Sequence, residues 1–335
     1  MKYLFELSKE HHTLPSAELI SCLHAERLPF IIIEKNNDVL VIDTSISESK
    51  IASVGQRMAF TFYIDTFLFS CSPTIGNVTE HAKKQKIEQN GSLAIRHKNR
   101  SETIDSQPLV QALASVFSRG RNVVLNNPDI EIRAYITDKV LYVGRKLVEI
   151  NRTQFEQRKV QYRPFFSPIS LHPKIARALV NLSGIRAKET LLDPFCGTGG
   201  ILLEAGRIGA KVIGSDIEQK MVDGCRQTLA FYHIPHDNIF CTDVSSIGKN
   251  VSCVDAIVTD LPYGKATTTK GEPITNLYDR AFHHLSEILK TNGRAVIGMG
   301  HNDMLSIGKQ YFSLKETHNW RAHRSLTRCF AVFEK

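Results

Sequence analysis

Residues Asp260–Gly264 follow directly on a strand-like apolar run and combine an acid, a proline and an aromatic ring. Two acceptors that hold both N–H bonds of an aromatic amine turn its lone pair toward an incoming electrophile, and we expect the Asp260 carboxylate and the Leu261 carbonyl to be these acceptors. Pro262 would fix the backbone, and Tyr263 would offer a ring face on which a base stacks. This pattern favours methylation of a planar amino nitrogen, mainly by orientation. The alternative is a proline turn after a buried strand.

The acid at the head of this motif also indicates which base it would hold. An ionised aspartate only accepts hydrogen bonds. Guanine presents two adjacent donors, N1–H and the 2-amino group, whereas adenine and cytosine present a donor beside an acceptor, which an asparagine amide would match better. Asp260 therefore favours guanine, and adenine stays open if the carboxylate takes only the amino protons.

A glycine-rich turn lies at Asp193–Gly200, between a strand-like and a helix-like run. Gly197 and Gly199 let the backbone adopt dihedral angles denied to other residues and approach a ligand closely. A nicotinamide fingerprint would have a further glycine where this chain has Leu202, and a P-loop would need Gly-Lys-Ser/Thr, which is absent. The turn instead fits S-adenosylmethionine, with a plain glycine turn as the alternative.

Two further acids end the next two strand-like runs. Asp216 is suited to accept hydrogen bonds from both ribose hydroxyls of a cofactor, and Asp243 from an adenine amino group. Singly, each would be an ordinary turn aspartate, but successive parallel strands end at one sheet edge, where ligands bind. The predicted cofactor-binding residues are Asp193, Gly197, Gly199, Asp216, Ile217, Asp243 and Val244.

From Pro164 onward, strand-like and helix-like runs alternate as in a doubly wound α/β sheet. We predict strands at 190–193, 211–215, 238–241, 254–260 and 294–299, and helices at 173–182, 200–208, 219–232 and 275–289. The segments 312–316 and 325–333 favour a terminal antiparallel hairpin. The predicted domain is a Rossmann-fold methyltransferase domain with a mostly parallel, seven-stranded sheet.

The first 150 residues have mixed α+β character. We expect strands at 3–7, 29–33, 39–42, 58–69, 130–136 and 139–148, and helices at 15–25 and 106–118. Thr13 or Ser16 is a candidate cap of the first helix. Residues 151–164 are polar and lack periodicity, so they are predicted to form a linker.

The composition, with 335 residues of which 23% are charged, is that of a folded protein with two or three domains. It contains no membrane-length apolar run and no secretory signal. Seven scattered cysteines without a Cys-x-x-Cys pair favour a reducing cytoplasm and argue against disulfides or zinc. Residues 83–165 hold 16 basic and 8 acidic side chains, a net charge of +8, against −4 over 1–82 (6 and 10) and +4 over 166–335 (20 and 16). The middle segment is a candidate polyanion-binding surface, or else a solvated basic surface.

These motifs resemble those of the archaeal tRNA guanine-10 N2-methyltransferases. The similar segments are Asp193–Ala205, Gly214–Asp216, Thr242–Asp243, Asp260–Gly264 and Arg163–Pro173. The resemblance is specific in sequence over residues 163–335, whereas over residues 1–162 it concerns only the architecture. The resemblance implies a ferredoxin-like domain at 1–48, a THUMP domain at 49–150 that engages the tRNA acceptor end, a linker at 151–164 and a methyltransferase domain at 165–335. It also implies S-adenosylmethionine as methyl donor and N2-methyl- or N2,N2-dimethylguanosine at position 10 as product. Many amino-methyltransferases have proline where this chain has Leu261.

We therefore expect a monomeric, metal-free enzyme that methylates guanosine 10 of tRNA, with Asp260, Leu261, Pro262 and Tyr263 at the reacting amine. The alternatives are transfer to another tRNA guanosine such as position 6, to DNA adenine or to a protein amide, and a non-catalytic tRNA-binding protein with a relict methyltransferase domain. The segment Trp320–Arg328 is interpreted as a phosphate-contacting or solvated turn. His283 and His284, for which we identify no acid at ligand spacing, are interpreted as structural.

Overall fold

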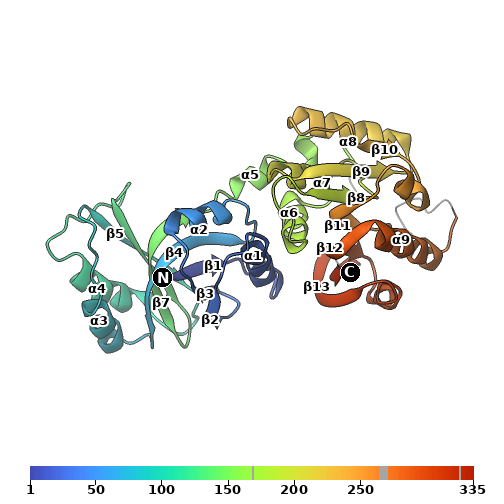
Figure 1. The fold of residues 1–335 in the computed structure, drawn as a ribbon. Coiled ribbons are helices and arrows are strands. Elements are labelled where there is room, and N and C mark those ends of the chain that lie inside the picture. The colour runs from blue at the N-terminus through green and yellow to red at the C-terminus, as the bar shows by residue number, and fades with distance from the viewer. Residues whose placement is uncertain (168–169, 264–270, 324–325) are drawn as a thin grey trace. The chain divides into compact units, whose positions relative to one another are not determined.

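The computed structural model describes residues 1–167, 170–263, 271–323 and 326–335 (Figure 1). Within them the chain forms two compact units: unit 1 comprises residues 1–10, 28–56 and 61–151, and unit 2 comprises residues 11–27, 57–60 and 152–335. The chain therefore passes from one unit to the other at five places, after residues 10, 27, 56, 60 and 151. Some residues of the predicted motifs lie outside the described part, namely Pro168, Ile169, Gly264, Arg324 and Ser325.

Unit 2 contains a sheet that has, among the described residues, seven strands in the order β10-β9-β8-β11-β12-β14-β13. Its strands are β8 (Thr190–Asp193), β9 (Lys211–Asp216), β10 (Ile239–Cys241), β11 (Val254–Asp260), β12 (Leu289–Met299), β13 (Ser313–His323) and β14 (Leu326–Glu334). The first five run parallel, and β14 lies antiparallel between β12 and β13. The predicted Rossmann-type sheet and its C-terminal hairpin are confirmed.

Helices cover both faces of this sheet, which explains why its central strands are almost wholly apolar. One face packs against α6 (Pro173–Leu182), α7 (Gly200–Arg207) and α8 (Gln219–Phe231). The other packs against η2 (Val244–Lys249) and α9 (Ile274–Ile288), whose buried positions recur at helical spacing. The short η3 (Asn302–Met304) and α10 (Leu305–Gly308) lead into β13.

The helix α1 (Leu14–Ala25) belongs to unit 2, although residues 1–48 were expected to form one N-terminal domain. Its Leu14 joins the same core as the residues of α6. The buried Glu18 carboxylate accepts the backbone N–H groups of Ala59 and Phe60, each at 2.9 Å. Thr13 occupies the N-cap position but makes no side-chain cap hydrogen bond. Residues 11–27 and 57–60 thus complete the core of unit 2.

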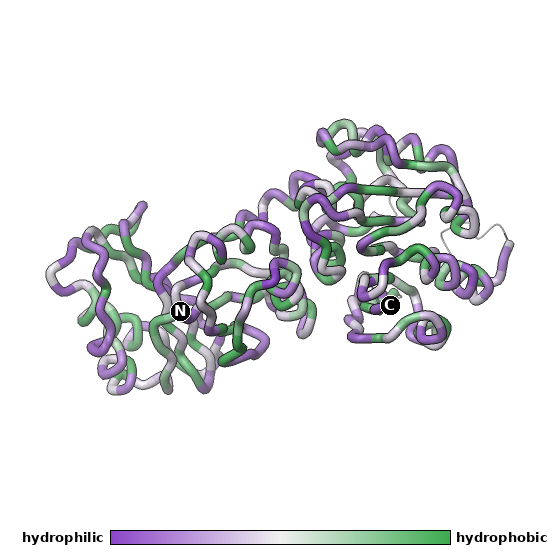
Figure 2. The backbone as a smooth tube through the Cα atoms, viewed as in Figure 1, coloured by the Kyte–Doolittle hydropathy of each residue, from purple (hydrophilic) through white to green (hydrophobic). Residues whose placement is uncertain are grey.

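Unit 1 contains one continuous sheet, with the described strand order β2-β3-β1-β4-β7-β6-β5. Its strands are β1 (Lys2–Leu7), β2 (Ile31–Lys35), β3 (Val39–Asp43), β4 (Thr61–Cys71), β5 (Leu93–Asn99), β6 (Ile130–Ile136) and β7 (Leu141–Glu149). Because β1 pairs with β4, the boundary expected between residues 48 and 49 does not coincide with a break in the sheet. Figure 2 shows the central strands of each unit largely in hydrophobic colours.

The helices of unit 1 are α2 (Glu48–Gly55), α3 (Ile75–Lys83) and α4 (Ser106–Phe117). Helices α3 and α4 pack together over β4 to β7 through a shared apolar core. Helix α4 was expected from sequence, whereas α2, α3 and β5 were not. Helix α3 buries only Val78 and Ala82, so its apolar periodicity is too weak to stand out.

The segment expected to be a linker is partly structured and anchored in unit 2. It contains α5 (Thr153–Glu156) and η1 (Val160–Tyr162), and Phe155 is fully buried. Arg158 donates two hydrogen bonds to Glu204, at 2.7 and 3.0 Å. All seven cysteines lie in the described residues and carry free thiols. Among the described helices, none combines the length and the apolar character that crossing a bilayer requires.

Candidate active site

A cavity of about 290 Å³ lies at the edge of the unit 2 sheet where the parallel strands β8, β9, β10 and β11 end. Ten of the predicted site residues line it: Asp193, Gly197, Asp216, Ile217, Asp243, Val244, Asp260, Leu261, Pro262 and Tyr263. Gly199 does not line the cavity. The expected convergence of the strand-end acids at one edge is therefore what the structure has.

The glycine loop turns from β8 into α7 with two left-handed residues, Gly197 at φ +49° and Gly199 at φ +80°. A Cβ built on Gly197 would meet no atom within 4 Å, so this position is open. A Cβ on Gly199 would lie 2.8 Å from Cys225 Sγ, because Gly199 packs against α8. Gly197 thus allows close approach of a ligand, and Gly199 allows the loop to pack.

Asp193 lies under the loop at the end of β8 and is almost completely buried. Its Oδ1 accepts hydrogen bonds from Thr259 Oγ1 at 2.7 Å and from the Phe195 backbone N–H at 3.2 Å. Burial raises the pKa of Asp193 to about 7, against the hydrogen bonds, which lower it. Burial therefore favours the neutral form of Asp193, and a cation in the cavity would favour its ionised form.

Asp216 ends β9, and backbone N–H groups donate hydrogen bonds to both of its carboxylate oxygens. Its Oδ2 accepts from the Gly197 N–H and its Oδ1 from the Glu218 N–H, each at 3.0 Å. Burial raises the pKa of Asp216, and these hydrogen bonds oppose that shift. Ile217, which is 39% exposed, follows it on the cavity wall. The carboxylate is therefore fixed in place at the rim of the cavity.

Asp243 begins η2 and is paired with Arg280, a residue that the sequence analysis missed. The Asp243 Oδ1 accepts from the Ser245 N–H at 2.9 Å, from Ser245 Oγ at 2.6 Å and from the Arg280 guanidinium. Burial alone would raise the pKa of Asp243, but these partners hold it below its usual value. Arg280 also binds Glu272, with Nη2 at 2.7 Å from Oε2. Both residues line the cavity.

The residues of the acceptor motif at the end of β11 hydrogen-bond to one another and to neighbouring elements. The Tyr263 hydroxyl donates a hydrogen bond to Asp260 Oδ1. The Leu261 N–H donates to the Gly298 carbonyl at 2.9 Å, which extends the β11–β12 pairing, and the Tyr278 hydroxyl donates to the Pro262 carbonyl at 3.1 Å. Burial raises the pKa of Asp260. Its side chain still keeps 20% of its surface exposed, on the cavity.

Two glycines, one in β12 and one just after it, make room for this motif. A Cβ on Gly298 would lie 2.2 Å from Asp260 Oδ1, and a Cβ on Gly300, just after the strand, would lie 2.9 Å from Tyr263 Cδ1. The sequence signal was a pair of glycines at alternate positions near the end of an apolar strand, where both side chains would face the same side.

The segment Trp320–Arg328 is not a simple solvated turn in its described part. Trp320 stacks on His11, with ring centres 5.7 Å apart, and packs against the core of unit 2. Arg328 lies on β14 with Nη1 3.6 Å from Asp260 Oδ2 and with 13% of its side chain exposed. Arg321 is exposed. Arg328 is therefore not part of a solvated turn, whereas phosphate contact by this segment stays a prediction.

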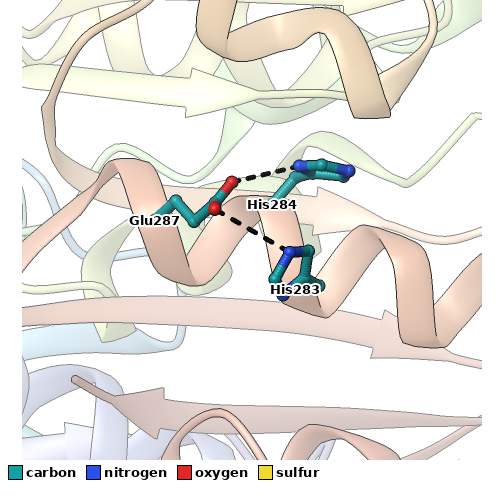
Figure 3. A group of neighbouring side chains, drawn as sticks. All are labelled: His283, His284 and Glu287. Carbon is teal, nitrogen blue, oxygen red and sulfur yellow. Dashed lines mark hydrogen bonds and ion pairs between the residues drawn. The ribbon is translucent and has the colours of Figure 1, made fainter.

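His283 and His284 do have an acid at ligand spacing, contrary to the sequence analysis. Figure 3 shows both rings directed at Glu287 on the same turn of α9, with His284 Nδ1 3.1 Å and His283 Nε2 3.8 Å from its carboxylate oxygens. His283 and Glu287 are more than half exposed. No fourth histidine, cysteine or acid of the described residues joins the group, and its members do not line the cavity.

A doubly wound sheet with an antiparallel β14, a glycine loop after β8, acids at three strand ends and a fourth acid just after β10 define a Rossmann-type methyltransferase. The family model described as "RMKL-like, methyltransferase domain" matches residues 160–329. The chain is 35% identical over 339 residues to a tRNA (guanine(10)-N2)-dimethyltransferase of Methanothermobacter thermautotrophicus, with 100% of both chains covered. It is 29% identical to a protein of the same name from Methanocaldococcus jannaschii, with 99% of both covered. The chain belongs to the family of archaeal tRNA (guanine(10)-N2)-dimethyltransferases.

Solved structures agree with this fold. TrmN from Thermus thermophilus matches over 100% of both chains with a TM-score of 0.59 and 18% sequence identity. SMU.472, a putative methyltransferase solved in complex with SAH, matches over 99% of this chain and 98% of its own with a TM-score of 0.56 and 13% identity. At these identities the likeness establishes the architecture of the chain.

Proposed function

We propose that this chain transfers the methyl group of S-adenosylmethionine to the exocyclic N2 amine of guanosine 10 in tRNA, giving N2-methyl- and then N2,N2-dimethylguanosine. The observation that carries the proposal is the position of Asp260, whose carboxylate opens on the same cavity as the glycine loop. The name of the Methanothermobacter relative supports position 10.

The cofactor side of the cavity fits an adenosine-bearing ligand. Gly197 is open to close approach, since a Cβ there would meet no atom within 4 Å. Asp216 is the acceptor for the ribose hydroxyls, because a carboxylate has about four acceptor sites and backbone N–H groups fill only part of them. Asp243 is the acceptor for the adenine amino group, with Ile217 and Val244 as apolar cover. When bound, S-adenosylmethionine supplies an electrophilic methyl group on a sulfonium sulfur.

The substrate side is built to orient an amine. The Asp260 carboxylate accepts N1–H and one N2–H of guanine, and the Leu261 carbonyl accepts the other N2–H, so that the nitrogen lone pair points at the methyl group. Pro262 restricts the backbone that carries this carbonyl. The ring of Tyr263 stacks on the base, which offsets part of the few kcal/mol that unpairing costs. Orientation of this kind supplies up to about 7–11 kcal/mol of barrier lowering in well-aligned systems.

The proton needs no strong base. Once methylated, the nitrogen becomes acidic and releases a proton to Asp260 or to water. A second cycle requires the remaining N–H to be held while the first methyl group occupies the other direction. The single N2–H of the monomethylated amine then donates its hydrogen bond to either Asp260 or the Leu261 carbonyl.

The tRNA itself is engaged by the basic middle of the chain. Residues 83–165 carry a net charge of +8 (16 basic minus 8 acidic), and most of them fold in unit 1. A positive surface of this kind binds phosphates without regard to sequence. We propose that residues 49–150 act as a THUMP module that holds the acceptor end and that the protein works as a cytoplasmic monomer.

The test is methyl transfer from labelled S-adenosylmethionine to tRNA transcripts, followed by nuclease mapping of the modified nucleoside. We expect label in N2-methylated guanosine at position 10 and none in a transcript with that guanosine replaced. A third transcript lacks guanosine 6, because a 26% identical relative is named tRNA (guanine(6)-N2)-methyltransferase. Loss of transfer to this third transcript alone would refute position 10.

A variant separates catalysis from binding. Asp260→Ala should abolish methyl transfer while tRNA binding, measured by filter retention, stays close to that of the wild-type chain. Full activity in this variant would overturn the mechanism. A wild-type chain that binds tRNA but fails to bind labelled S-adenosylmethionine would favour the relict-domain alternative.

A further inference from the structure

Arg328 is directed at the acceptor carboxylate from a strand that the cavity does not include. It lies on β14 opposite Trp320 of β13, and its Nη1 is 3.6 Å from Asp260 Oδ2. Its guanidinium carbon is 5.5 Å from the centre of the Tyr263 ring. Its Nε is buried and has no hydrogen-bond partner among the described residues. A guanidinium kept in such a place without full hydrogen bonding contributes mainly its charge.

The charges around Asp260 explain why that cation is needed. Burial raises the pKa of Asp260, and the Arg328 charge and the Tyr263 hydroxyl lower it. Asp193 on β8 is a further acid close enough that the charges of the two carboxylates disfavour each other. Tyr278 on α9 also faces Asp260, and that negative charge helps to raise its own pKa. Among the described groups that act on Asp260, Arg328 is thus the cation whose charge lowers its pKa.

The spacing keeps the carboxylate available. At 3.6 Å the Arg328 nitrogen is farther from Oδ2 than a normal hydrogen bond, so it stabilises the charge without using a lone pair of that oxygen. An ionised Asp260 offers acceptors only, whereas a protonated one offers a donor beside an acceptor. The ionisation state of Asp260 therefore decides which arrangement of donors and acceptors on a base the site can hydrogen-bond.

We propose that Arg328 is a positioning residue that keeps Asp260 an acceptor-only carboxylate and thereby makes the site select guanine, whose N1–H and 2-amino group are both donors. This assignment rests on the proposed N2-methylation of guanosine. Arg328 acts through Asp260 and does not line the cavity.

The test uses two tRNA transcripts that differ in the target base, at N1 and at the 6-oxo group. One carries guanosine at position 10, and the other carries 2-aminopurine, which keeps the 2-amino group but has an acceptor at N1. For Arg328→Gln at about pH 7 we expect the preference for guanosine to fall about tenfold relative to wild type, because part of Asp260 becomes protonated. Comparing variant with wild type cancels the different reactivity of the two amines.

The pH dependence supplies a readout that a merely structural role would not move. In Arg328→Gln, transfer to guanosine should fall on going from about pH 8 to about pH 6 by roughly tenfold more than in the wild type. Arg328→Lys should restore much of the wild-type profile because it keeps the charge. Arg294→Gln is the matched control, since Arg294 pairs with Glu334 on the same sheet and does not contact Asp260.

The ionisation of Asp260 is also measurable without any methyl transfer. Carboxyl-carbon NMR of protein labelled at aspartate, with Asp260→Asn to identify the resonance, should give a higher midpoint in Arg328→Gln than in the wild type. An unchanged midpoint and an unchanged base preference would overturn the role of Arg328. A wild-type chain that methylates neither transcript would refute the proposed substrate, while the NMR result still decides whether Arg328 controls the carboxylate.

Discussion

The Tyr263 hydroxyl donates a hydrogen bond to the Asp260 carboxylate, the same acceptor that the substrate amine requires. The hydroxyl occupies one lone pair of Oδ1, so it competes with a substrate N–H for this oxygen. Entry of a base can then exchange one donor at Oδ1 for another. The Tyr263 hydroxyl thus caps Oδ1 until a base with suitable donors replaces it.

The first prediction concerns this cap. Tyr263→Phe removes the hydroxyl but keeps the ring, so we expect kcat/KM for tRNA to stay within about threefold of the wild-type value. Tyr263→Ala should lose about tenfold or more, because base–aromatic stacking is worth about 1–3 kcal/mol. Steady-state methyl transfer with both variants measures the difference. Equal losses of kcat/KM in the two variants would mean that the Tyr263 hydroxyl, and not its ring, contributes to methyl transfer.

A second prediction tests the space that β12 provides. Gly298→Ala places a methyl group 2.2 Å from Asp260 Oδ1 and must displace the carboxylate. We expect methyl transfer to fall about a hundredfold, the usual scale for a misplacement of about 1 Å, with S-adenosylmethionine binding retained. Gly248→Ala is the control, since a Cβ there meets nothing within 4 Å. Wild-type rates in Gly298→Ala would exclude Asp260 from the reaction.

A third prediction follows from the buried Asp193. Its folded-state pKa of about 7 lies above its ordinary value of 3.8, so the folded chain holds a proton that the unfolded chain has lost between these values. The free energy of unfolding should therefore decrease as the pH rises through this window. Asp193→Asn should remove the share of this decrease that Asp193 contributes, while Asp65, Asp216 and Asp260, whose pKa values are also raised, keep theirs. The variant should be more stable than the wild type at about pH 8, by on the order of a few kcal/mol, but not at about pH 3.

Urea unfolding of the two proteins across this pH range measures the effect. Asp237→Asn, at an exposed carboxylate, is the matched control and should leave the pH dependence unchanged. A wild-type chain whose stability difference from Asp193→Asn is the same at both pH values would contradict the burial argument.

A fourth prediction concerns the attachment of α1. Glu18→Gln turns one acceptor oxygen into a donor that faces the backbone N–H groups of Ala59 and Phe60 or the Asn181 amide. A buried donor left without an acceptor costs about 1–3 kcal/mol, so the free energy of unfolding should drop by about 2 kcal/mol. Trp320, the one tryptophan of the chain, packs near Phe60 and stacks on His11, so its fluorescence reports unfolding at this place. The exposed Glu287→Gln should have no such effect.

The parts of the fold that could be predicted from sequence are those set by the pattern of neighbouring residues in the chain. Each parallel strand of unit 2 contains a short apolar run, and Asp193, Asp216 and Asp260 end their strands, so the rules of a parallel sheet bring these residues to one edge. The glycine loop could likewise be predicted from its local sequence. The cavity lining shared by these residues is consistent with that reasoning.

The rest depends on pairs that are far apart in the chain. Arg328 meets Asp260 because β14 enters the sheet beside β12, and periodicity does not tell where a closing strand enters. Arg280 meets Asp243 across two elements in the same way. Helix α1 was recognised as a helix, but its apolar face does not tell which core it joins. The ionisation and packing of the site thus rest on contacts that a linear pattern does not carry.

The position of α1 also sets an order of events during synthesis. Residues 11–27 leave the ribosome early, yet α6, against which α1 packs, begins at Pro173, nearly 150 residues later. At translation rates of about 5–20 residues per second, that interval is on the order of ten seconds or more. Throughout it the apolar face of α1 has no partner helix. The nascent chain must therefore keep that face from aggregating until the second half of the protein emerges.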